Sequence, residues 1–140
     1  MSPREKFIEF LKQQIGKPYL WGANGPAAYD CSGLICAAMR AAGLQIGDHC
    51  VMDLHSMFMD KSISKYTRPG QLFFYHSPAS HVMAAVEYWG DYRGTLIGAR
   101  GGWELTSDLQ RAWDAIAFVD CVRSNYWENV LSMIADPWED

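Results

Sequence analysis

Cys31 is the residue in this sequence best placed to act as a nucleophile. It directly follows Asp30, a predicted N-cap, and so falls in the first turn of a helix expected from Cys31 to about Ala42 and ending at Gly43. The amides and dipole at a helix start favour the thiolate, which is the nucleophilic form of cysteine, whereas the nearby carboxylate of Asp30 raises the pKa of the thiol. Judged by this position alone, such a cysteine is more often a packing residue than a nucleophile.

The pattern around this cysteine strengthens the case for catalysis. Residues 16–22 read Gly-Lys-Pro-Tyr-Leu-Trp-Gly, and after a short loop residues 30–34 read Asp-Cys-Ser-Gly-Leu. This string resembles the NlpC family of papain-like cysteine peptidases, whose signature is a Pro-Tyr-x-Trp-Gly loop followed by Asp-Cys-Ser-Gly at the catalytic helix. The resemblance implies a cysteine peptidase with the papain-like NlpC fold.

Two downstream segments extend the resemblance. Residues 68–74, Arg-Pro-Gly-Gln-Leu-Phe-Phe, resemble the Pro-Gly-Asp-Leu-x-Phe-Phe segment of the family, with Gln71 where Asp is usual. Residues 80–82, Ser-His-Val, resemble its Ser-His-Val-Gly strand, with Met83 where Gly is usual. The similarity runs from about residue 7 to residue 123, which is nearly the whole chain.

The resemblance implies that Cys31 is the nucleophile and His81 the general base. Such a base must lie within hydrogen-bond reach of the thiol, take its proton and later deliver one to the leaving amine. Only His81 has both the motif and a strand position. A solvated or capping role is expected for the other three histidines, which are His49, His55 and His76.

Substrate contacts are also implied by the resemblance. Tyr19 and Trp21 would line the cleft, and Asp30 and Ser32 would hold the free amine of a stem peptide. The backbone amide of Cys31, at the helix start, is the expected oxyanion donor. The alternative interpretations are core packing for the two aromatic residues and plain helix capping for Asp30, and both are compatible with the functional roles.

One position departs from the family pattern. The family places a third polar residue, usually His and sometimes Asn or Gln, on the strand after the histidine strand, where it orients the imidazole. The aligned residue here is Gly98, which has no side chain to bond to His81. A backbone carbonyl, a water, or a nearby residue such as Arg100 or Glu104 would have to fix the tautomer instead. The third catalytic position is therefore unknown, and slower catalysis is expected.

Helices are predicted first along the chain. A capping box of Ser2 and Glu5, with Pro3 at the first helical position, begins a helix that stops at Gly16. The helix that starts at Cys31 is almost entirely small or apolar and is expected to be buried and central. A third, shorter helix is expected over residues 51–59.

Strands are predicted after residue 68, where the hydrophobic period changes from helical to alternating. Residues 90–94 are expected to form a hairpin loop longer than the tightest types. Helices followed by antiparallel strands favour the α+β class, with the buried catalytic helix packed on an antiparallel sheet. The four expected strands are Gln71–Tyr75, His81–Trp89, Thr95–Arg100 and Ala115–Arg123.

The C-terminal segment is predicted to be helical. Apolar residues recur at helical spacing at positions 127, 130, 131 and 134, which indicates an additional amphipathic helix over about 125–135. The acidic end, Asp136–Asp140, is expected to be a solvated tail. The domain prediction is therefore one unit over residues 1–140, with a core of about 7–123 and this added helix.

The composition of the chain excludes several classes of function. The 140 residues are 49% hydrophobic and carry a net charge of −4, which suits one folded domain and lacks the basic surplus of a nucleic-acid binder. No apolar stretch is long enough to span a membrane. The cysteine spacing favours neither a disulfide framework nor a zinc site, and no metal or organic cofactor is implied. Small buried packing roles are expected for Cys36, Cys50 and Cys121.

The leading hypothesis is a peptidoglycan hydrolase that cleaves a stem-peptide amide, specifically the γ-D-glutamyl bond to the diamino acid, through an acyl-enzyme. No signal peptide is visible at the N-terminus. An enzyme of bare-domain size without a wall-anchoring repeat suits a phage or prophage origin, carried on a tail or released at lysis, and otherwise a cytoplasmic protein is expected. Two alternatives stay open: a weakly active or inactive module that binds a peptide or partner, and an amidase or acyltransferase with the same Cys-His pair.

Overall fold

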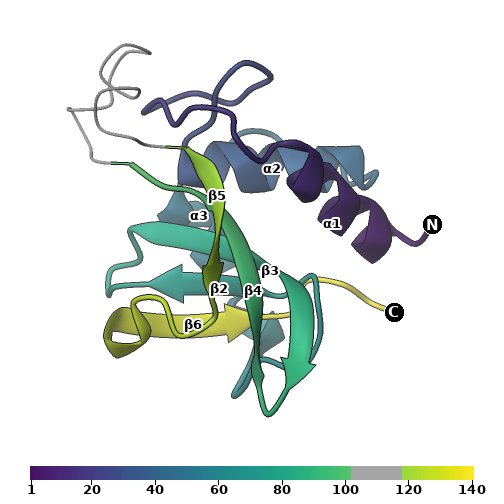
Figure 1. The fold of residues 1–140 in the computed structure, drawn as a ribbon, viewed down its shortest axis with the longest axis vertical. Helices are drawn as coiled ribbons and strands as arrows, with labels where there is room; N and C mark the ends of the chain where they lie inside the picture. Colours follow the sequence, from purple (N-terminus) through teal and green to yellow (C-terminus); the bar gives the residue numbers. More distant parts are fainter. Residues whose placement is uncertain (102–117) are drawn as a thin grey trace.

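The computed structural model describes residues 1–101 and 118–140. In these ranges three α-helices precede six strands that form one antiparallel sheet in the order β1-β6-β2-β3-β4-β5 (Figure 1). The arrangement confirms the predicted α+β class. The helices are α1 (Pro3–Gln13), α2 (Cys31–Ala41) and α3 (Val51–Met57), and the strands are β1 (Ser62–Ile63), β2 (Leu72–Tyr75), β3 (His81–Gly90), β4 (Arg93–Ala99), β5 (Val119–Arg123) and β6 (Leu131–Ala135).

The two N-terminal helices form for the local reasons predicted. At α1 the Ser2 hydroxyl accepts a hydrogen bond from the Glu5 backbone N–H, and the Glu5 carboxylate accepts one from the Ser2 backbone N–H. At α2 the Asp30 carboxylate accepts from the Gly33 backbone N–H. No helix in the described ranges is long and apolar enough to cross a membrane.

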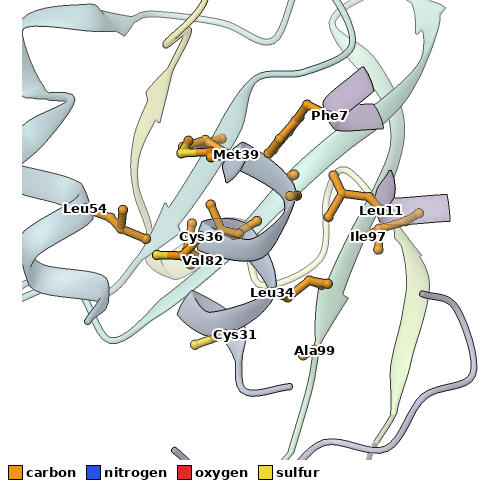
Figure 2. Packing of buried hydrophobic residues seen from close by; sticks show 14 of the residues in the cluster. Phe7, Leu11, Cys31, Leu34, Cys36, Met39, Leu54, Val82, Ile97 and Ala99 are labelled. Atoms are coloured by element: carbon orange, nitrogen blue, oxygen red, sulfur yellow. The ribbon is translucent and has the colours of Figure 1, made fainter. Parts of the chain in front are cut away.

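Each face of the sheet carries its own hydrophobic cluster, because successive side chains of a strand point to opposite faces. Phe74 and Val82 point toward the helices, where α2 lies packed against α1 and β4 (Figure 2). Phe73 and Met83 lie on the opposite face with Tyr66. The helix α2 is therefore buried on nearly all sides, as predicted, and its first residue is held at the end of the larger cluster.

The β3–β4 hairpin is tighter than predicted. Asp91 and Tyr92 alone connect the two strands, and both have positive φ angles, of 53° and 61°. Two consecutive residues of positive φ are typical of the two-residue turns whose twist matches that of antiparallel strands. The prediction of a longer loop was wrong because Asp-Tyr is not one of the usual sequences for such a turn.

The predicted helix over 125–135 is wrong. Residues 131–135 form β6, which pairs with both β1 and β2, and the residues before it form a turn and a short 3₁₀ helix, Glu128–Val130. Its apolar residues fit a helical period, but pairing with two strands satisfies the backbone on both edges and buries Ile134 against the second cluster. The segment is thus an inner strand of the sheet and not an addition to a core that ends at residue 123.

The acidic C-terminus is not a free tail. The buried guanidinium of Arg4 forms ion pairs with Asp136 and Asp140, each at 2.9 Å. The Trp138 indole N–H donates to the Gly70 carbonyl at 2.9 Å. The prediction of a solvated end was wrong because the cations that pair with it come from distant parts of the chain: Arg4 of α1, more than 130 residues earlier, and Arg68 before β2.

Candidate active site

A cavity of about 380 Å³ lies where α2 and β3 begin. It brings together all six residues predicted for the site. They come from the loop before α2, from α2 itself and from β3, and they are Tyr19, Trp21, Asp30, Cys31, Ser32 and His81. A larger cavity, of about 610 Å³, contains none of the six and is lined mainly by the β3–β4 hairpin and the segment around β6.

The nucleophile position is built by local contacts around Asp30. Its carboxylate accepts hydrogen bonds from the backbone N–H groups of Gly33, at 2.6 Å, and Gly22, at 3.0 Å, and from the Ser32 hydroxyl at 3.3 Å. It therefore caps α2 and ties the preceding loop to the helix. Figure 2 shows Cys31 at the resulting end of α2.

Gly33 is required by the same packing. A Cβ at this position would overlap the Ala23 carbonyl oxygen and lie 2.8 Å from the Asp30 carboxylate. Contacts of this kind are essentially never found around real Cβ atoms, and a backbone carbonyl cannot swing away as a long side chain can. The Asp-Cys-Ser-Gly string therefore has a structural reason at three positions beside the cysteine: a cap, a hydroxyl that bonds to the cap, and a residue without a side chain.

The electrostatics of Cys31 differ from the expectation of a stabilised thiolate. The residue is 9% exposed, and burial followed by the charge of Asp30 raises the pKa of its thiol to about 11. Backbone groups of Val82, Ser32 and Cys31 itself act in the opposite direction but do not reverse the shift. The resting sulfur is a neutral thiol, because desolvation outweighs the helix terminus.

His81 is the first residue of β3 and lies opposite Tyr75 of β2. Burial, followed by the charges of Arg100 and His76, lowers the pKa of its imidazole to about 4. The ring is therefore neutral near pH 7 and able to accept a proton. Its neighbour Val82 acts on the Cys31 sulfur through a backbone hydrogen bond, so the start of β3 and the start of α2 are in contact.

Tyr19 and Trp21 occupy different parts of the cavity. Tyr19 is buried, and burial, followed by the charges of Cys31 and Asp30, raises the pKa of its hydroxyl well above the usual value. It therefore stays a neutral hydrogen-bonding group near the sulfur. Trp21 is 59% exposed at the rim, so the core-packing alternative applies to Tyr19 and not to Trp21.

Of the other three histidines, one lines the cavity and two do not. His76, expected in a solvated turn, follows β2 with a φ of 68° and also lines the cavity. His49 lies 3.6 Å from the Asp53 carboxylate, and His55 packs edge-on against Phe74, with ring centroids 5.3 Å apart; neither lines the cavity. His76 is thus the remaining alternative to His81 as the general base.

Trp127 is a cavity residue that the sequence did not reveal. It is 45% exposed, and its ring centroid lies 5.6 Å from those of both His76 and His81. It was assigned to a helix that does not exist, whereas its φ of 50° places it in the turn between β5 and β6. The sequence signal that could have indicated it is the dense cluster of aromatic residues at positions 126 and 127.

Two cysteine predictions are corrected. Cys36 is buried on α2, as expected, but Cys50 and Cys121 are exposed, and Cys50 lines the cavity at the start of α3. Among the described residues, all four cysteines are free thiols. Residue 104, named as an alternative orienting group for His81, lies outside the described residues.

Comparison with known proteins agrees with the geometry. A model of the NlpC/P60 family matches residues 16–133. "Probable endopeptidase p60" of Listeria grayi is 36% identical over 74 residues, which cover 51% of this chain and 14% of that protein. A protein of Mycobacterium bovis, also named a "Probable endopeptidase", is 33% identical over 88 residues, which cover 63% of this chain and 22% of that protein. The chain spans less than a quarter of the length of these curated relatives.

The fold is shared with solved structures. The peptidoglycan hydrolase RipB of Mycobacterium tuberculosis superposes with a TM-score of 0.68 at 22% sequence identity, covering 99% of this chain and 66% of that one. The region matched by the family model contains the loop before α2, the cavity, strands β1 to β5 and the first residues of β6. The sequence motifs, the cavity they line and the family match therefore agree, and the chain belongs to the NlpC/P60 family.

Proposed function

We propose that this chain is a cysteine peptidase that hydrolyses an amide bond in peptidoglycan stem peptides. The observation that carries the proposal is the single cavity lined by Cys31, His81 and the four predicted substrate-contact residues. The names of the relatives support the reaction class, since two are named "Probable endopeptidase" and the structural neighbour RipB is named a peptidoglycan hydrolase. Such a substrate makes the cell wall the proposed site of action.

Catalysis begins in this proposal from a neutral thiol and a neutral imidazole. As the Cys31 sulfur attacks the amide carbonyl, His81 removes the thiol proton, so that charge develops as the C–S bond forms. The backbone N–H of Cys31, at the start of α2, donates to the oxyanion of the tetrahedral intermediate. Collapse of that intermediate breaks the C–N bond, and the proton on His81 goes to the leaving amine.

Hydrolysis of the acyl-enzyme repeats these steps with water. His81 takes a proton from the water as its oxygen attacks the thioester carbonyl, and the second intermediate expels the Cys31 sulfur. The proton returns to sulfur, which restores the neutral pair. Because burial raises the pKa of the thiol and lowers that of the imidazole, both groups are neutral at rest, and the proposed proton transfer accompanies the attack of sulfur.

The bond we propose joins γ-D-glutamate to the diamino acid. Asp30 supports this choice because its carboxylate lines the cavity beside Cys31, where it attracts the ammonium of a stem peptide with a free amine. An ammonium there would also offset the charge of Asp30, which raises the pKa of the thiol.

A weakly active binding module is the second candidate. It is favoured by the raised pKa of the Cys31 thiol and by the glycine at position 98, where the family has a polar residue. The same cavity would then hold a stem peptide without cleaving it at a useful rate. An amidase or acyltransferase on another substrate would use the same pair of residues.

Digestion of purified peptidoglycan separates these candidates. We expect the wild type to release new amino groups, and Cys31→Ala to lose this activity by at least about a thousandfold, because the nucleophile is absent. Cys36→Ala is the matched control, since Cys36 lies on the same helix but outside the cavity. Muropeptide masses identify the bond. Release that persists in Cys31→Ala, or no release by the wild type, contradicts the peptidase proposal.

The assignment of the base is tested in the same assay. His81→Ala should abolish release, whereas His76→Ala should retain most of it, because His76 lies at a more exposed turn position. The reverse result would transfer the role of base to His76.

A further inference from the structure

The position aligned with the third polar residue of the family is filled by another side chain. Gly98 of β4 faces β3, where the antiparallel register of Ala84 opposite Ile97 continues to Met83 opposite Gly98. A Cβ on Gly98 would lie 2.6 Å from Cε and 2.9 Å from Cγ of Met83. Met83 in place of the usual glycine and Gly98 in place of the usual polar residue are therefore one packing change. Any side chain that orients His81 must come from an element other than this position of β4.

Two buried polar atoms near this position have no hydrogen-bond partner. Among the described residues, the buried side-chain nitrogen and oxygen atoms without a partner are the Tyr75 hydroxyl oxygen and Nε2 of His81. They belong to residues that face each other across β2 and β3, with ring centroids 5.6 Å apart and planes inclined by 38°. An unpaired buried polar atom is costly, so two of them on facing residues call for a common explanation.

The other groups around the ring are less suited to the task. The Arg100 guanidinium carries only donors, so it cannot accept the Nε2 proton, and it is bound to Asp120, with one contact at 2.7 Å. Trp127 offers only an N–H donor and packs on the ring at 5.6 Å. Among the described residues, the titratable and charged groups near His81 are Tyr75 (β2), His76 (after β2), Arg100 (after β4), Cys31 (α2) and Asp30 (the cap of α2). Tyr126, in the β5–β6 turn, packs edge-on against Tyr75.

We propose that Tyr75 is the positioning residue for His81. Its hydroxyl oxygen accepts the Nε2 proton through one bridging water, which holds the neutral ring in a single tautomer and leaves Nδ1 to take the proton of Cys31. The two residues face each other with their rings in contact, and a water between them satisfies both unpaired atoms at once. The role rests on the proposed function, since it orients the base of that same reaction.

Tyr75→Phe tests this role because it removes one oxygen and keeps the ring. Tyr66→Phe is the matched control: Tyr66 belongs to the same cluster, but its hydroxyl donates to the Glu87 carbonyl at the far end of β3. The first readout is the ¹⁵N spectrum of the His81 imidazole, which reports the tautomer without any substrate. We expect mainly the Nε2–H form in the wild type and in Tyr66→Phe, and a mixture of tautomers in Tyr75→Phe.

The second readout is the kinetics of peptide release. Loss of an orienting partner should lower kcat about tenfold with KM unchanged in Tyr75→Phe, and leave both unchanged in Tyr66→Phe. An unchanged tautomer in Tyr75→Phe, or equal losses in both variants, overturns the proposal. If the wild type releases no peptide, the peptidase proposal fails, while the spectrum alone still decides whether Tyr75 positions His81.

Discussion

The segment that carries Cys31 and the strand that carries His81 are held in place in different ways. Around Cys31, the helix cap, the preceding loop and the close contact at Gly33 are all made by residues between 22 and 33, and the carboxylate of Asp30 accepts three hydrogen bonds from within that segment. Around His81, the neighbours come from β2, from the region after β4 and from the β5–β6 turn, and one ring nitrogen has no described partner. Local sequence organises the proposed nucleophile, whereas distant segments organise the proposed base.

This difference explains where the family pattern holds and where it departs. Residues 22–33 supply both partners of most contacts around Cys31, so a single substitution there disturbs contacts that no other segment replaces. The family motif is accordingly nearly complete in this segment. At the base, a change on β3 can be matched by a change on β4, as Met83 and Gly98 show. We therefore expect the nucleophile segment to tolerate single changes poorly and the base region to tolerate paired ones.

The largest effect is expected for Gly33→Ala. The new methyl group meets the Ala23 carbonyl and the Asp30 carboxylate, so we expect a loss of about 3 kcal/mol in the free energy of unfolding and of most peptide release. Chemical denaturation measures the first and the peptidoglycan assay the second. Gly47→Ala is the control, because nothing lies within 4 Å of a Cβ at that position. Similar stabilities of the two variants would contradict the expectation that residues 22–33 tolerate single changes poorly.

Burial of His81 should appear as a pH dependence of stability. Its pKa is lowered to about 4 in the folded chain from 6.5 in the unfolded one, so the unfolded state binds more protons between these values. This contribution to stability is complete above pH 6.5 and is lost as the pH falls to 4, by about 3 kcal/mol in total.

Denaturation of the wild type and of His81→Gln at a series of pH values measures this contribution. The difference between the two curves removes the carboxylate titrations that both proteins share. Parallel curves between pH 6.5 and 4 would mean that the imidazole is not desolvated in the folded protein.

The smallest effect on stability is expected for substitutions at Gly98 and Met83, the facing residues of β4 and β3. Gly98→His alone should cost about 2 kcal/mol, because the Met83 side chain occupies the space of the new one. Met83→Gly with Gly98→His should recover about half of that loss, and should raise kcat if the new imidazole reaches His81. A double-mutant cycle measured by denaturation and peptide release gives the coupling. Strictly additive effects would contradict the view that the two departures are one change.

Much of the site could be predicted because its signals are local. The motif from Tyr19 to Ser32 predicted the capped, buried helix and the residues that line the cavity with Cys31, and the strand motif predicted His81. Trp127 and His76 were missed for opposite reasons: one was assigned to a helix by the period of its apolar neighbours, and the other was judged only by its turn chemistry. In both cases the cavity is formed by segments whose approach no local pattern encodes.

What the sequence alone determined is the family, the α+β class and the six residues that share one cavity, because caps, periodicity and short motifs act over a few residues. Only the tertiary structure decided that residues 131–135 pair as an inner strand, that the thiol is neutral, and that Met83 fills the space beside Gly98. Strand pairing, desolvation and side-chain volume depend on groups far apart along the chain, and their energies are set only when those groups meet.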